Sequence, residues 1–356
     1  MKKKLNINKD YLITYGIVIV FYIVMQILFG TGNLSSLLKG LLVPLCVYTI
    51  MAVSLNLTVG ILGELSLGHA GFMCVGAFSA AFFSMYTKDV ISSSLLRFII
   101  AILISAVVAA IFGILIGIPV LRLKGDYLAI VTLAFGEIIK NVINILYVGK
   151  DGSGIHISTK DTISLGLAED GKVIINGAQG ITGTPNDSTF TIGIILLLIT
   201  LFIVLNFMNS RSGRAVMAIR DNRIAAESVG ISISKYKLMA FAISASLAGV
   251  AGALYAHNLS TLNAMPKNFG YNMSIMILVY VVLGGIGNIR GSIIAATILT
   301  VLPELLRGFS DYRMLIYAIV LIAMMLFNAS PKAIEWKEKH SIKQMIATKK
   351  QAKEVK

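Results

Sequence analysis

Charged side chains are scarce in this sequence: Asp, Glu, Lys and Arg make up only 13% of its 356 residues. A soluble globular domain carries about 25%. Hydrophobic residues account for 56% of the chain, and the mean hydropathy is +0.84. Because so few polar side chains cannot cover a water-soluble fold of this size, the composition predicts a protein embedded in a lipid bilayer.

Cysteine is also rare, and its positions exclude two kinds of site. Cys46 and Cys74 both lie inside apolar runs, without the spacing of a disulfide framework or a metal site. They are expected to pack as small hydrophobic residues. The sequence has no G-x-x-x-x-G-K-[ST] loop and no His, Asp or Cys cluster at nucleophile spacing. We therefore expect no catalytic residues, cofactor, metal ion or nucleotide site in this chain.

The formal net charge of +14 would favour nucleic acid as a partner if the chain were soluble. The basic residues, however, fall between apolar segments and at the two ends, as they do in membrane proteins. Nucleic-acid binding is therefore excluded, and the lipid bilayer is the expected surroundings.

Ten stretches with few or no charged residues are each long enough to be considered as a transmembrane helix, for which about 20 residues are needed. The first is too long for the apolar core of a secretory signal, so we interpret it as a retained helix. The sequence predicts an all-α, polytopic integral membrane protein of about ten transmembrane helices. Two junctions, 62–70 and 284–291, are uncertain, and the first is a candidate re-entrant break. The stretches are 11–30, 40–63, 70–87, 98–121, 127–149, 189–210, 238–256, 268–289, 291–306 and 314–330.

The orientation follows from the distribution of basic residues, which favour the cytoplasmic side. With both ends inside, 21 of the 31 Lys and Arg residues are cytoplasmic. This predicts a cytoplasmic N-terminus at 1–10, a transmembrane domain at 11–330 and a cytoplasmic basic tail at 331–356. The long connection 150–188 is then extracellular, and the long connection 209–237 is cytoplasmic.

The two long connections differ in character. The extracellular one is polar and rich in glycine, and Asp170-Gly171 before the β-prone run 172–175 predicts a small hairpin. The cytoplasmic one predicts a helix over 214–229 that ends at Gly230. Such a helix is either a lever that docks into a soluble partner or a helix that lies on the membrane surface. Its apolar residues, which could share one face, are Val216, Ile219, Ala226 and Val229.

The cytoplasmic connection resembles the coupling segment of ATP-binding-cassette importer permeases. Ala225, Ala226 and Gly230 match part of their Glu-Ala-Ala-x-x-x-Gly motif, although Ile224 stands at the glutamate position. Other segments narrow the resemblance to LivM-type branched-chain amino acid permeases, over about residues 40–328. The stretch 150–180 resembles an insertion, and Thr184 replaces a glycine common in the family. The matching segments are 63–72, 124–139, 182–186, 212–230 and 284–291.

The resemblance implies that this chain is one subunit of a larger importer. Its partners would be a second, homologous permease, two cytoplasmic ATPases that bind the ATP, and an extracellular solute-binding protein. Closure of the ATPases would push on the cytoplasmic helix and switch the spans between outward-open and inward-open states. The residues expected to couple the chain to the ATPases are Arg214, Arg220, Asp221, Arg223, Glu227 and Gly230.

Ionisable residues inside or beside spans are candidates for the translocation path, because a charge is costly to bury in lipid. Glu137 and Lys140 share a helical face at a spacing of three. They either form a structural ion pair, or face the path and contact the amino acid or a neighbouring subunit. Glu64 and His69 flank the second span among small residues and are expected to act as a gate or hinge. Thr132, in one of the matching segments, is a further candidate.

The sequence therefore predicts a permease subunit, not an enzyme, of a bacterial cell (plasma or inner) membrane. It would translocate branched-chain, hydrophobic amino acids, using ATP hydrolysed by partner subunits. Two alternatives stay open: the same architecture importing another small solute such as urea or an amide, and an ion-coupled secondary transporter.

Overall fold

The computed structural model describes residues 9–31, 36–121, 125–168 and 171–329. The chain divides into two compact units, one up to Thr300 and one from Val301 onward. The second unit contains the end of α12, a 3-10 segment at Leu306–Tyr312 and the helix α13. The predicted basic tail, and most of the predicted N-terminal segment, lie outside the described residues.

Each expected span contains helical structure in the described part of the chain, but the span expected over 127–149 is too long: its helix ends at Asn144, and a strand begins at Tyr147. Among the described residues, eight segments are long and apolar enough to cross a membrane. The count of ten stays a prediction, because α11 has 14 residues and α13 has 17. The helices are α1 (Lys9–Gly30), α2 (Ser36–Asn56) with the π-helix η1 (Leu57–Leu62), α3 (His69–Tyr86), α4 (Ser94–Val120), α5 (Asp126–Asn144), α6 (Phe190–Asn209), α9 (Ile233–Ala256), α11 (Tyr271–Gly284), α12 (Ile289–Leu305) and α13 (Arg313–Ala329).

The expected single helix over 268–289 is wrong. A four-residue helix, α10 (Pro266–Phe269), is separated from α11 by Gly270, whose backbone is extended. A side chain at Gly270 would collide with the backbone of Pro266, at 2.5 Å from its carbonyl oxygen. With a rise of 1.5 Å per residue, α11 covers about 21 Å of a hydrocarbon core that is about 30 Å thick. This part of the chain is therefore a broken helix.

Helix α9 lies at the centre of the first unit, with α2, α3 and α4 packed around it. Small residues, among them Gly249 and Gly252, allow these close approaches. A Cβ atom on Gly252 would lie 2.2 Å from the carbonyl oxygen of Met73 in α3. One on Gly249 would lie 2.5 Å from Ala109 in α4. Close backbone contact is a usual way for membrane helices to associate.

The connection after α5 forms a small antiparallel sheet of β1 (Tyr147–Asp151), β2 (Gly154–Ser158) and β3 (Lys172–Asn176), in the order β2-β1-β3. The strand predicted at 172–175 is present and pairs with β1, while Asp170, in the turn of the predicted hairpin, lies outside the described residues. The hairpin joins β1 to β2, and β3 pairs with β1. Hydrogen bonds from Ser153 hold the pKa of the Asp151 carboxyl well below its usual range, which anchors the β1–β2 turn. A second pair of strands, β4 (Ile181–Thr182) and β5 (Thr261–Leu262), lies beside it.

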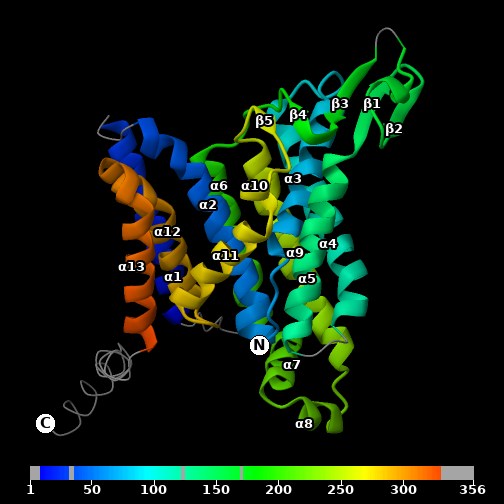
Figure 1. Ribbon diagram of the computed structural model, residues 1–356. Helices are drawn as coiled ribbons and strands as arrows, with labels where there is room; N and C mark the ends of the chain where they lie inside the picture. Colours follow the sequence, from blue (N-terminus) through cyan, green and yellow to red (C-terminus); the bar gives the residue numbers. More distant parts are fainter. Residues whose placement is uncertain (1–8, 32–35, 122–124, 169–170, 330–356) are drawn as a thin grey trace, which may run out of the picture. The chain divides into compact units, whose positions relative to one another are not determined.

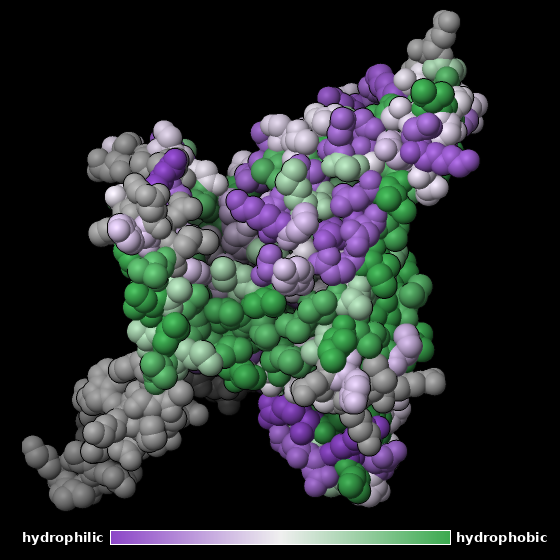
Figure 2. Space-filling view, viewed as in Figure 1, coloured by the Kyte–Doolittle hydropathy of each residue, from purple (hydrophilic) through white to green (hydrophobic). Residues whose placement is uncertain are grey.

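The sheet and the helices of the 209–237 connection lie at opposite ends of the first unit (Figure 1). Figure 2 shows hydrophobic side chains between these ends and hydrophilic side chains gathered over the sheet and over α7 and α8. Such an apolar belt between two polar ends fits a protein that crosses a bilayer.

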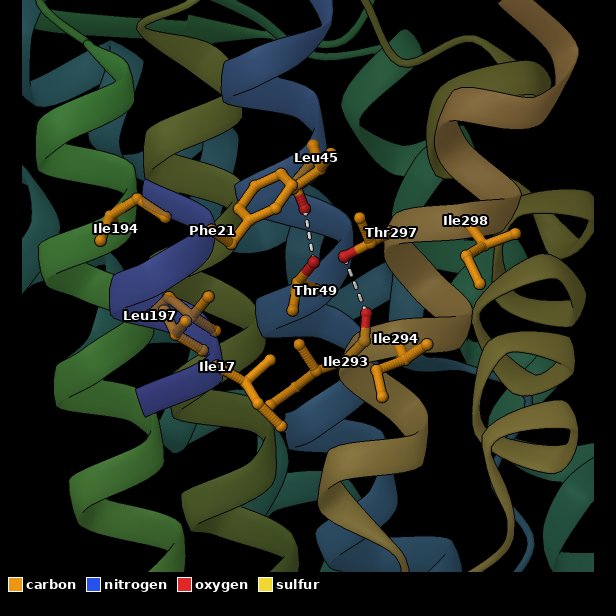
Figure 3. Close-up of a pocket in the computed structure, with 11 residues that line it drawn as sticks. Ile17, Phe21, Leu45, Thr49, Ile194, Leu197, Ile293, Ile294, Thr297 and Ile298 are labelled. Carbon is orange, nitrogen blue, oxygen red and sulfur yellow. Dashed lines mark hydrogen bonds between the residues drawn. The ribbon is translucent and has the colours of Figure 1, made fainter. Parts of the chain in front are cut away.

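Helix α1 is the most exposed of the candidate spans, with 11% of its apolar window buried. A cavity of about 130 Å³ separates it from α2, α6 and α12 (Figure 3). The hydroxyls of Thr49 and Thr297 in its wall donate to carbonyls of their own helices, Leu45 and Ile293, at 2.7 and 2.8 Å. Because the cavity wall is otherwise apolar, this cavity does not suit a zwitterionic solute.

Candidate functional site

The connection 209–237, which was predicted to be cytoplasmic, folds into two helices, so the expected continuous helix over 214–229 is wrong. Helix α7 covers Arg211–Asp221, and α8 covers Arg223–Ser228. Asn222 between them is extended, with φ −154° and ψ 105°, and its side chain accepts a hydrogen bond from the N–H of Ala225 at 3.0 Å. Asn is a preferred helix N-cap, so this residue ends one helix and starts the next.

The buried side of this helical hairpin matches the prediction in three of four residues. Val216, Ile219 and Ala226 are buried, and Ile219 and Ala226 pack with Ile233 at the start of α9. Val229 was expected on the same face, but it is 74% exposed because the break at Asn222 rotates α8 away from the line of α7. Together with Ile224, which is 81% exposed, it forms an apolar tip on α8.

The predicted helix stop at Gly230 is present and has a defined geometry. Gly230 has a φ of +84°, a left-handed conformation that glycine adopts without a steric penalty. Its N–H donates to Glu227 O at 3.0 Å, and the N–H of Ile231 donates to Ala226 O at 3.1 Å. These two bonds make a Schellman motif, which satisfies the last carbonyls of α8.

Arg220 joins the hairpin to the transmembrane bundle. Its NH1 group donates to the carbonyl oxygen of Gly60 in η1 at 2.9 Å, and its Nε and NH2 groups donate to Asp221. A Cβ atom on Gly63 would lie 2.5 Å from the Arg220 side chain, so only glycine leaves room for it. Arg220 was predicted to act at the cytoplasmic helix, and the structure turns it toward the second span.

The other predicted coupling residues surround the hairpin. Arg214 donates from NH1 to Asn209 O at 2.7 Å, which fastens α7 to the end of α6. Arg223 and Glu227 are exposed on α8 beside the apolar tip. No contact in the structure tests their predicted role with an ATPase.

Asn56, Gly287 and Ser292 complete the junction around η1. Gly287 lies in the matching segment 284–291, whereas Asn56 and Ser292 were not among the predicted residues. Asn56 Oδ1 accepts from Gly287 N at 2.9 Å, and its Nδ2 donates to Ser292 at 2.8 Å. A Cβ atom on Gly60 would lie 2.4 Å from Gly287 N. The turn between α11 and α12 therefore packs directly on η1. The sequence did contain a signal for this junction: Asn56 is a polar residue in an apolar span, and such residues are usually functional or structurally paired.

The segment 63–68 between η1 and α3 leaves the helical conformation, as expected for the uncertain junction. Glu64 forms an ion pair with Lys237 of α9; their side chains are 14% and 7% exposed. His69 is buried and its Nε2 lies 2.7 Å from the Ser54 hydroxyl. Lys237 was not among the predicted residues, because pairing across distant helices leaves no local pattern.

Thr132 holds the same segment from α5. Its hydroxyl accepts from Leu67 N at 3.0 Å and donates to Ala129 O at 3.0 Å, and the residue is fully buried. Its contacts are thus with the backbone that joins α2 to α3. The structure brings Thr132, Glu64 and His69 to this one segment.

Glu137 and Lys140 form the expected ion pair on α5, with side-chain exposures of 25% and 8%. Glu137 also accepts, through Oε1, from the N–H of Tyr271 at 2.8 Å. Tyr271 is the first residue of α11, where the helix dipole favours a negative charge. The pair therefore fixes the broken helix, a contact that i,i+3 spacing alone did not reveal.

Residues 37–327 match the family described as branched-chain amino acid transport system / permease component. The chain belongs to this family. It is 35% identical over 291 residues to the high-affinity branched-chain amino acid transport system permease protein LivM of Salmonella typhimurium, and 36% identical to that of Escherichia coli. Each of these alignments covers 79% of this chain and 66% of the relative. The chain therefore spans slightly less than two thirds of the length of each relative.

A more distant relative is named a fructose import permease protein, FruG of Bifidobacterium longum. It is 22% identical, over 94% of this chain and 95% of its own length. No solved structure matches the chain significantly. Family membership and the apolar helices together place the chain among multi-pass membrane proteins of this family.

Replacing Arg220 with Gln tests the junction at η1. A hydrogen bond from a charged group contributes about 1.5–3 kcal/mol, and the lower end applies here because Arg220 is 39% exposed. We expect solute uptake to fall about tenfold at an unchanged amount of protein in the membrane. Lys235→Gln, which removes an exposed charge at the same end, is the control. Equal uptake by the two variants would exclude Arg220 from coupling.

Replacing Glu137 with Ala removes the acceptor for Tyr271 N and leaves Lys140 buried without its carboxylate, so uptake should fall while the protein still assembles. Glu137→Gln keeps an oxygen for Tyr271 N and should retain more uptake than Glu137→Ala. The double variant Glu137→Gln/Lys140→Met decides between the two interpretations of the pair. If it transports as well as the natural sequence, the ion pair is structural; if uptake stays low, the charges act in transport.

Proposed function

We propose that this chain is the permease subunit of an ATP-driven importer of branched-chain amino acids in a bacterial cell membrane. The names of the 35–36% identical relatives support the substrate class. The bond from Arg220 to Gly60 carries the mechanical part of the proposal. It joins the exposed α7–α8 hairpin to the break in the second span, and a lever needs such a connection.

In this importer α8 is the contact with an ATPase. Its apolar tip, Ile224 and Val229, stands among the charged residues Arg223 and Glu227. A small apolar surface with a charged rim suits docking into a groove on a soluble protein. Two ATPases, a second permease and an extracellular solute-binding protein complete the complex, with the sheet β1–β3 on the binding-protein side.

The membrane orientation gives a direct test of this arrangement. Cys46 and Cys74 are buried, so single cysteines can be introduced at exposed positions. We expect a membrane-impermeant maleimide to label Lys160→Cys, in the extracellular connection, in intact cells. Ile224→Cys on α8 should be labelled only after the cells are permeabilised. Labelling of position 224 in intact cells would remove the contact with cytoplasmic ATPases.

The energy source and substrate are tested by transport in vesicles that contain the assembled complex. We expect uptake of labelled leucine to require ATP and to persist when proton and sodium gradients are collapsed. Excess isoleucine and valine should compete, and urea and acetamide should not. Uptake driven by an ion gradient without ATP would instead identify a secondary transporter. Competition by urea alone would reassign the substrate.

A further inference from the structure

Lys237 is buried in the second turn of α9, the central helix of the first unit, and forms an ion pair with Glu64. The two side chains are only 7% and 14% exposed, so the pair is largely removed from water. Salt and solvent screen such a pair much less than an exposed one. The attraction therefore holds the start of α9 firmly to the segment that follows η1.

Gly60 and Glu64 lie on opposite sides of Gly63, where the chain leaves η1. Gly63 ends η1 in a left-handed conformation, with a φ of +78°. Arg220 of α7 donates to the carbonyl oxygen of Gly60, which comes before this turn. Lys237 of α9 pairs with Glu64, which comes directly after it. The end of the second span is thus held on one side of Gly63, and the segment that leads to α3 is held on the other.

Arg220 and Lys237 belong to one packed unit, although α8 separates them in the sequence. Ile219 of α7, Ala226 of α8 and Ile233 of α9 pack on one another. Ile219 directly precedes Arg220, and Ile233 lies about one helical turn before Lys237. Movement of the α7–α8 hairpin with the start of α9 therefore carries both basic side chains together.

Two attachments transmit a rotation that one attachment does not. With a single hydrogen bond to Gly60 O, the hairpin can pivot about that bond, and its rotation is lost there. A second attachment beyond Gly63 converts the rotation into a change in the bend between η1 and α3. Glycine allows this change, because it populates left-handed and right-handed backbone conformations about equally readily. Hinges are formed by a few such residues that absorb large changes in φ and ψ.

We propose that Lys237 is a positioning residue of the transport cycle and that Gly63 is the hinge on which it acts. Lys237 and Arg220 hold the two sides of Gly63, and rotation of the α7–α8 hairpin changes the bend between η1 and α3. The pair of Lys237 with Glu64 stays closed while the hinge moves, so it is a grip and not a gate that opens in each cycle. This inference rests on the proposed function, in which ATPases move the hairpin.

Uptake per ATP hydrolysed, measured with the assembled complex in vesicles, tests the grip. Glu64→Gln/Lys237→Met removes the pair without leaving a buried charge unpaired, so the complex should still assemble. We expect this variant to hydrolyse ATP at a near-natural rate, while uptake per ATP falls at least about fivefold. Glu64→Lys/Lys237→Glu forms the pair with reversed charges and should restore most of the loss. Lys235→Met, at an exposed position on the same stretch of α9, is the matched control and should transport normally.

Crosslinking separates a grip from a gate. Cys46 and Cys74 are buried, so the variant Glu64→Cys/Lys237→Cys can be joined by a bis-methanethiosulfonate with a short alkyl spacer. Joining the two positions should raise uptake by this variant toward the natural level, and a reducing agent should reverse the gain. A crosslink that blocks uptake would show that the pair opens in each cycle, which overturns the proposal.

The remaining outcomes distinguish this inference from the proposed function. Natural uptake per ATP in Glu64→Gln/Lys237→Met would make the pair purely structural and would also overturn the grip. If uptake requires no ATP, the proposed function fails, yet a gain of uptake on crosslinking still supports the grip and a block still excludes it. The amount of complex recovered from the membrane establishes that each variant assembles.

Discussion

Backbone that leaves the regular α-helical conformation inside an apolar bundle must find its hydrogen bonds in neighbouring elements, and this constraint organises the first unit of the chain. Two regions depart from regular α-helix: η1 with the segment 63–68, and the ends of α11 at Gly270 and 285–288. Arg220 donates to Gly60 O, and Leu67 N donates to Thr132. Ala70 N donates to Ser274, Tyr271 N to Glu137, and Gly287 N to Asn56. Each break is thus closed by a side chain from another element.

These bonds connect the two regions to each other and to the α7–α8 hairpin. Arg220 of α7 donates to Gly60 O in η1. Asn56, just before η1, accepts from Gly287 N in the turn that ends α11. At its other end, α11 begins at Tyr271, whose N–H donates to the Glu137 carboxylate. Helix α5 also holds Leu67 through Thr132, so it contacts both breaks. In the proposed importer, this continuous set of contacts is the route by which movement of α7 and α8 reaches the spans.

Much of this fold could be predicted from the sequence, because uncharged runs and basic flanks are direct consequences of a bilayer environment. The helix stop at Gly230 and the pair Glu137–Lys140 follow from local spacing. The break at Gly270 was missed because Gly270 lies in the uncharged run 268–289, where hydropathy does not distinguish a broken helix from a continuous one. The partner of Glu64, which is Lys237, was missed because the two are 173 residues apart and meet only through tertiary packing. Asn222 did carry a local signal, as a preferred N-cap, and shows that helix formers alone do not decide where a helix ends.

Glycine decides how closely the elements of the η1 junction approach. Gly60 contacts the turn at Gly287, and Gly63 contacts the side chain of Arg220; a Cβ atom at either position would lie 2.5 Å or less from its neighbour. The contact of Gly60 with Gly287 is therefore set by backbone position, and a backbone packed at this distance has little freedom to slide without moving its neighbour. In the proposed importer, a displacement of α7 that keeps the Arg220 bond would pull on η1, and with it on the turn that ends α11. Coupling through such a junction would depend on close-packed backbone, and a lever of this kind would contact the second span at a break and not along a regular helix.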